Sequence, residues 1–208
     1  MNEMNVPVGV SNFEEIRKNG YYYIDKSELI RELLSNTGTK ATVITRPRRF
    51  GKTLGMSMLE SFFDIRKDSR KLFEGLEIAE NQALCDAWMN RYPTVSISFR
   101  QIDGLNFMDA YRQLVYEIAL LYQKHTYLLD SQAISNQEKS LFQQISDRKA
   151  EKTDVMRSIQ FLTLLLNKHY NKKVILLIDE YDVPVAKANN NGYYAEMLDV
   201  MKGLMQAL

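Results

Sequence analysis

One short stretch, residues 45–53, limits the folds open to this chain more than any other part of it. It reads Thr-Arg-Pro-Arg-Arg-Phe-Gly-Lys-Thr, follows the β-branched run 41–44 and precedes the helix-like segment 54–65. A strand, a tight loop ending in Gly-Lys-Thr and a helix together form the layout of a phosphate-binding P-loop. The sequence therefore predicts an α/β fold in which residues 41–44 form the strand that leads into a phosphate site.

The residues at the end of this loop each have a chemical part in holding phosphate. Amide groups at a helix N-terminus lack partners and attract anions, and Gly51 lets the backbone turn close to the ligand. Lys52 would reach the terminal phosphates as a mobile charge, and Thr53 would offer its hydroxyl to Mg²⁺. The general motif has glycine where this chain has Arg46, and Pro47 lacks an amide donor, so a basic loop-to-helix junction is the alternative.

A second stretch, residues 174–178, is a continuous apolar run that ends at Asp179 and Glu180. Its composition is typical of a parallel strand with both faces covered, and open α/β sheets place their ligands at the carboxyl ends of such strands. This is the pattern of a Walker B strand, in which Asp179 would hold Mg²⁺ through water. Glu180 would orient and deprotonate an attacking water. A strand that ends in an exposed acidic turn is the alternative.

Together, and in this order along the chain, the two motifs predict a Mg²⁺-dependent ATPase. Lys52 and Glu180 are its predicted catalytic residues, while Thr53 and Asp179 are its predicted metal ligands. Two other functions stay open: a nucleotide-binding switch that scarcely hydrolyses ATP, and a small-molecule kinase. The adjacent carboxylates of Asp179 and Glu180, and the lack of a visible lid for an acceptor, argue against the kinase.

Residues 46–53, together with residues 179–182, resemble the motifs of the bacterial AAA-ATPase-like family, whose members look like relatives of the archaeal-type ATPases. Residues 21–30 resemble that family's entry segment, and the resemblance covers about residues 8–208. It implies that arginine at the first loop position is usual, and it implies ATP and Mg²⁺ as ligands. The predicted nucleotide-binding residues are Arg46, Pro47, Arg48, Arg49, Phe50, Gly51, Lys52 and Thr53.

The resemblance also bears on partners. Many members of that family carry a restriction-endonuclease-like nuclease domain after the ATPase, and nothing of that kind is recognisable in this sequence. The expected partners besides the nucleotide are therefore a C-terminal nuclease domain or further copies of the chain. A role with nucleic acid follows from family analogy alone.

Other side chains near the motifs carry weaker expectations. Arg48 and Arg49 would add charge at the γ-phosphate or pair with Asp182 in the empty site, with a solvated basic loop as the alternative. In ATPases that this chain resembles, the segment before the first helix lines the base pocket. Tyr23 and Ile24 would then flank adenine, unless they form a hydrophobic staple for the following helix.

The expected architecture is a three-layer αβα fold with a mostly parallel sheet, in one P-loop domain over residues 1–208. Lys52 and Asp179 are 127 positions apart (179 − 52), which is long for such a fold and predicts a helical insertion at about residues 105–170. No segment after Asp182 has the pattern of the sensor strand that such ATPases carry. The domain is therefore expected to be truncated before that strand.

Hydrophobic periodicity and turn signals predict the remaining elements. Residues 94–99 alternate as a strand, and residues 106–123 carry the apolar stripe of an amphipathic helix. Residues 153–170 are predicted to form one long helix, and residues 189–192 a loop before a helix at 193–208. Capping patterns predict helix starts at Asn12 and Ser135.

Bulk composition excludes some classes of function. The chain has 27 basic and 26 acidic residues and a net charge of +1, which gives no general attraction to nucleic acid or to an acidic membrane. Its single cysteine, Cys85, favours a reducing compartment. No apolar run approaches the ~20 residues that cross a bilayer and residues 1–20 lack a secretory pattern, so a cytoplasmic location is predicted. His125 and His169 lack a neighbouring histidine or cysteine and are predicted to be surface or helix-end residues.

Overall fold

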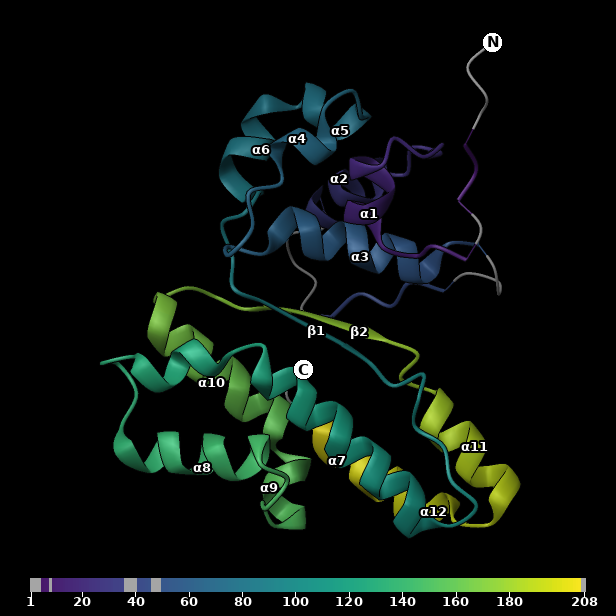
Figure 1. The fold of residues 1–208 in the computed structure, drawn as a ribbon, viewed down its shortest axis with the longest axis vertical. Helices are drawn as coiled ribbons and strands as arrows, with labels where there is room; N and C mark the ends of the chain where they lie inside the picture. Colours follow the sequence, from purple (N-terminus) through teal and green to yellow (C-terminus); the bar gives the residue numbers. More distant parts are fainter. Residues whose placement is uncertain (1–4, 8, 36–40, 46–49, 207–208) are drawn as a thin grey trace. The chain divides into compact units, whose positions relative to one another are not determined.

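The computed structural model describes residues 5–7, 9–35, 41–45 and 50–206. The chain divides into two compact units, Met1–Thr94 and Val95–Leu208. Helices dominate both units, and Figure 1 shows the order in which helices and strands follow one another in each. The helical insertion expected at about residues 105–170 falls within the second unit.

The first unit is a cluster of short helices with an aromatic core. Its helices are α1 (Phe13–Lys18), α2 (Glu28–Ser35), α3 (Lys52–Phe63), α4 (Arg70–Phe73), α5 (Glu77–Glu80) and α6 (Gln82–Trp88). The rings of Phe13 and Phe62 both contact the ring of Phe73, with centroid distances of 4.9 and 5.3 Å. All three side chains are fully buried. Burial of each contributes about 1.5–3 kcal/mol, so these rings hold α1, α3 and α4 together.

Single polar side chains fix the ends of helices in this unit. The side chain of Asn12 accepts a hydrogen bond from the Glu15 amide (3.0 Å), which confirms the predicted start of α1. Asn90 has a left-handed backbone (φ 54°), and its side-chain amide donates to the carbonyls of Ser61 and Asp64. Asn90 therefore ties the segment after α6 to the C-terminal end of α3.

Residues 41–44, predicted to be the strand before the phosphate loop, are not a strand in this structure. Residues 41–45 carry no regular secondary structure, and the Val43 side chain is 67% exposed. A strand needs burial of its apolar face as well as β-branched residues, because its propensity reflects packing on a half-buried surface. The exposed run lacks that burial, so its composition alone was a misleading signal.

The second unit contains the sheet of the structure. Among the described residues this sheet has two strands, β1 (Thr94–Ser98) and β2 (Ile175–Asp179), which run parallel. Both strands were predicted from sequence. The Phe99 amide donates to the Asp179 carbonyl (3.0 Å), so the pairing continues to the end of β2. The mixture of helices and a parallel sheet agrees with the predicted α/β class.

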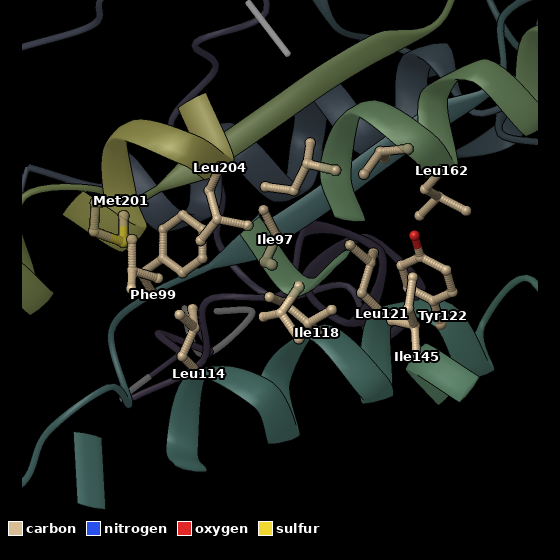
Figure 2. Packing of buried hydrophobic residues seen from close by; sticks show 14 of the residues in the cluster. Ile97, Phe99, Leu114, Ile118, Leu121, Tyr122, Ile145, Leu162, Met201 and Leu204 are labelled. Atoms are coloured by element: carbon tan, nitrogen blue, oxygen red, sulfur yellow. The ribbon is translucent and has the colours of Figure 1, made fainter. Parts of the chain in front are cut away.

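Helices of the second unit enclose one large apolar core. They are α7 (Phe107–Gln123), the 3-10 helix η1 (Thr126–Asp130), α8 (Asn136–Ser146), α9 (Lys152–Met156), α10 (Ser158–Tyr170), α11 (Val183–Asn191) and α12 (Tyr194–Met205). Figure 2 shows Ile97 and Phe99 of the β1 segment against Leu114 and Ile118 of α7, with Leu204 of α12 nearby. The core therefore packs the inner face of β1 against α7 and α12.

The long helix predicted at residues 106–123 is confirmed as α7. Asn106 caps it by accepting a hydrogen bond from the Asp109 amide (3.0 Å). Leu114, Ile118 and Leu121, three members of the predicted apolar stripe, are buried in the core. The predicted start at Ser135 is confirmed too, because Ser135 and Glu138 form a reciprocal capping box at α8.

Two predictions in the second unit were wrong. The single helix expected at residues 153–170 is broken at Arg157 into α9 and α10. Residues 189–191, expected to be a loop, are the end of α11, which stops at Gly192 with a left-handed backbone (φ 81°). The left-handed backbone of Gly192 ends α11, and hydrophobic periodicity does not report a boundary of this kind.

Gly104, in the loop between β1 and α7, is packed against the first turn of α7. A Cβ atom added there would lie 2.4 Å from the Ala110 amide nitrogen and 2.9 Å from Asp109 Cβ. Gly104→Ala is therefore expected to destabilise the second unit by about 1–3 kcal/mol, because overpacking forces the backbone to shift. Chemical unfolding followed by circular dichroism would measure the change. The neighbouring Leu105 is 87% exposed, so Leu105→Ala is the control that should leave stability unchanged.

Candidate functional site

The N-terminus of α3 has the geometry of a helix end that attracts anions. Gly51 is the N-cap and has a left-handed backbone (φ 76°), and α3 begins at Lys52 and runs for 12 residues. The Gly51 carbonyl accepts the first helical hydrogen bond, from the Gly55 amide (2.8 Å). Amides of the first turn have no partner within a helix, so this end carries partial positive charge. Gly51, Lys52 and Thr53 thus occupy the turn and the first helical positions that their predicted roles require.

Phe50 and residues 46–49 make up the rest of the predicted nucleotide-binding loop. Phe50 directly precedes Gly51 and its side chain is 59% exposed. The predicted nucleotide-binding residues Arg46, Pro47, Arg48 and Arg49 lie outside the described residues. Their roles stay predictions.

The entry segment, residues 21–27, supplies side chains that pack beside α3. The half-buried Tyr23 ring lies against Phe13 (5.3 Å between centroids), and its hydroxyl donates to Met58 Sδ of α3 (3.2 Å). Burial raises the pKa of Tyr23 to about 12, so its hydroxyl stays protonated. Ile24 is 64% exposed. The adenine contact expected for Tyr23 and Ile24 stays a prediction, since Tyr23 has a packing role that is sufficient by itself.

Lys26 is the residue of this segment that sequence analysis missed. Its Nζ donates a hydrogen bond to the Phe50 carbonyl (3.2 Å), immediately before Gly51. A Cβ atom added to Gly51 would lie 3.2 Å from the same Nζ. The two partners are 24 positions apart in the sequence, and no local pattern connects them. A second lysine therefore reaches the turn that carries Lys52.

The predicted acidic pair lies at the carboxyl end of β2. Asp179 is 6% exposed, and its Oδ1 accepts a hydrogen bond from the Glu180 amide (3.0 Å). Glu180 is half-buried and has a left-handed backbone (φ 54°). This conformation costs a residue other than glycine about 1–2 kcal/mol, and such strain is concentrated at functional sites. Nothing in the sequence signalled it.

The segment after Glu180 is tied to the loop after β1. Lys187 of α11 pairs with Asp103 (3.0 Å), and this hydrogen bond from the ammonium lowers the pKa of the Asp103 carboxyl. The Gly104 carbonyl accepts hydrogen bonds from the Asn191 side chain (3.0 Å) and from the Tyr193 hydroxyl (2.8 Å). The loop after β1 is thereby linked to α11 and to the turn that follows this helix.

Metal binding stays a prediction for Thr53 and Asp179. Thr53 belongs to the first unit and Asp179 to the second. Within the described residues no group of three or more His, Cys, Asp or Glu side chains could hold a metal ion. Mg²⁺ commonly takes one or two protein ligands and completes its shell with phosphate oxygens and water, which suits a hydroxyl and a carboxylate.

His125 lies just after the end of α7, which agrees with its predicted position at a helix end, and its side chain is buried.

The chain is similar to known proteins at the level of a family and of an individual relative. A family model named AAA-ATPase-like and described as "Predicted AAA-ATPase" matches residues 7–208. An uncharacterized protein in the vnfD 5′ region of Azotobacter chroococcum mcd 1 is 28% identical over 186 residues. That alignment covers 89% of this chain and 30% of the relative, so the chain spans less than a third of the relative's length. No solved structure matches the chain.

In the described part of the chain, no helix combines the length and the apolar character needed to cross a membrane.

Proposed function

Because the chain belongs to the AAA-ATPase-like family of predicted ATPases, we propose that it binds ATP with Mg²⁺ and hydrolyses the bond between its β- and γ-phosphates, releasing ADP and phosphate. One observation carries the proposal. The left-handed Gly51 caps a helix whose first two residues are Lys52 and Thr53, which is the arrangement that cradles phosphate in P-loop proteins. The family implies nucleotide binding; the choice of ATP, the metal and the hydrolysis are the proposal.

In the proposed complex the phosphates lie at the N-terminus of α3. The amides of the first turn and the Lys52 ammonium would bind the β- and γ-phosphates, and the Thr53 hydroxyl would be a ligand of Mg²⁺. Asp179 would hold the ion through water, and Glu180 would take the proton of the attacking water. A three-layer P-loop fold with a mostly parallel sheet would bring these groups together, and the parallel pairing of β1 with β2 supports it.

The alternative is an ATP-binding switch with little hydrolysis. It is favoured by the length of the matched relative, of which this chain spans 30%. Other parts of such a protein could supply a sensor residue or an arginine that completes the hydrolytic site. A nuclease domain, further copies of the chain and nucleic acid are the partners that such a switch would act on, and these too are proposals.

A titration of ATP into the chain, with and without Mg²⁺, combined with a phosphate-release assay, tests the proposal. We expect saturable ATP binding that chelation of Mg²⁺ weakens, and release of phosphate that chelation stops. Thr53→Val keeps the shape of the side chain but removes its hydroxyl, so it should abolish the Mg²⁺-dependent part of the affinity. Binding without phosphate release would select the switch. Absence of nucleotide binding at millimolar ATP would refute both.

A further inference from the structure

Lys26 lies beside the turn that precedes α3. Its side chain is half-buried and extends to the Phe50 carbonyl, where Nζ donates a hydrogen bond of 3.2 Å. A lysine ammonium has three donors, so two remain for another acceptor after this bond is made. The same Nζ is 3.2 Å from the point where a Gly51 side chain would begin. Glycine at position 51 therefore also leaves room for this cation.

The backbone on either side of Lys26 is held firmly. Asp25 accepts hydrogen bonds from the amides of Ser27 and Glu77 (both 2.8 Å). Burial acts to raise the pKa of Asp25, but these amide hydrogen bonds outweigh it and the pKa is lowered, so the carboxylate is charged at neutral pH. Ser27 is fully buried, and its hydroxyl accepts from the Ile78 amide (3.1 Å). Lys26 therefore lies in a segment that two hydrogen bonds attach to the start of α5.

The charges around the Lys26 ammonium indicate that its ligand is an anion. Lys26 lies next to the N-terminus of α3, where the helix dipole is positive and where Lys52 adds a further charge. Among the described residues, Phe50 is the partner with which Lys26 makes a hydrogen bond. An ammonium beside the positive end of a helix is stabilised when one anion binds to both groups. The arrangement is favourable when phosphate oxygens lie over the helix end.

We propose that Lys26 is a second phosphate-contacting lysine of the nucleotide site and binds the polyphosphate together with Lys52. The proposal rests on the proposed function, because it assigns one more residue to the same phosphate site. The chemical class of its ligand is the di- or triphosphate of a nucleotide, not the base or the sugar. Lys26 would use the donors that its bond to Phe50 leaves over, so the turn would keep its shape when the nucleotide binds.

Lys26→Met, which keeps the length of the side chain and removes its charge, tests the assignment. We expect its affinity for ATP to fall by about tenfold or more, the usual effect of losing a hydrogen bond to a charged group. The loss should be graded with phosphate number, large for ATP, smaller for ADP and absent for AMP. Inorganic tripolyphosphate, used to displace a fluorescent ATP analogue, should lose affinity in parallel with ATP. Lys26→Arg should recover most of the ATP affinity.

The control is Lys18→Met, on α1 of the same unit. Lys18 pairs with Glu14 on the surface and its side chain is 63% exposed, so its loss changes net charge by the same amount and should alter ATP affinity less than twofold. Equal losses for AMP, ADP and ATP in Lys26→Met would show a structural role only and overturn the assignment. Unchanged ATP affinity would overturn it as well. A wild-type chain that binds no nucleotide would instead refute the proposed function.

Discussion

Lys52→Ala is expected to weaken ATP binding by roughly 100-fold or more, the effect of losing charge-assisted contacts to two phosphates. The fold should survive the change, because Lys52 is the first residue of α3 and alanine is the best helix former. The left-handed turn at Gly51, which shapes the loop, is left intact by the change. Isothermal titration with ATP and Mg²⁺ would measure the loss.

The matched control for this experiment is Lys71→Ala. Lys71 lies on α4 of the same unit and is exposed, so the variant removes the same charge from a place without a proposed ligand. It should bind ATP as the wild type does. If Lys52→Ala kept wild-type affinity while remaining folded, the α3 N-terminus would not be the phosphate site.

Glu180→Gln is expected to bind ATP with near wild-type affinity while its steady-state phosphate release falls by about 10²–10⁴-fold, the usual contribution of a general base. Glutamine has the shape of glutamate but accepts no proton, and it can adopt the same backbone conformation at the end of β2. The reduced turnover should not come from unfolding. Phosphate release and ATP titration on the same preparation would separate binding from catalysis.

A carboxylate that is remote from the acidic pair provides the comparison. Glu196 is exposed on α12 of the same unit, so Glu196→Gln makes an identical chemical change and should hydrolyse ATP at the wild-type rate. Full turnover in Glu180→Gln would show that another group activates the water. It would leave ATP binding by α3 unaffected, since the two variants address different steps.

Local signals in the sequence predicted local structure well. Asn12 and Ser135 each cap a helix as predicted, because a short polar side chain just before a helix can accept a hydrogen bond from an amide of its first turn. The predictions of α7 from its apolar stripe and of β2 from its apolar run were also correct, because the pattern of apolar residues within each segment is enough to indicate its burial. For the candidate site, the sequence pointed to Gly51, Lys52 and Thr53 at the turn before α3, and to Asp179 and Glu180 at the end of β2.

Features that depend on distant contacts were beyond such reasoning. Residues 41–44 have the composition of a strand, but composition does not say whether burial will follow. The break at Arg157 lies where Met156 packs against Gly203 of α12, at a distance that leaves no room for another side chain there. Lys26 contacts the carbonyl of Phe50, 24 positions away. Its neighbours Asp25 and Ser27 accept hydrogen bonds from amides at the start of α5, more than 50 positions away.

The hydrogen bonds that join α11 to the loop between β1 and α7 restrain this helix at its C-terminal end. One end follows Glu180, whose backbone is held in an uncommon conformation, and the other end is latched to Gly104 through Asn191 and Tyr193. A change in the backbone torsion angles at Glu180 would shift α11 and strain its hydrogen bonds to Gly104. Either these bonds would break or the loop between β1 and α7 would move with the helix, so a small change at the acidic pair would reach the N-terminus of α7.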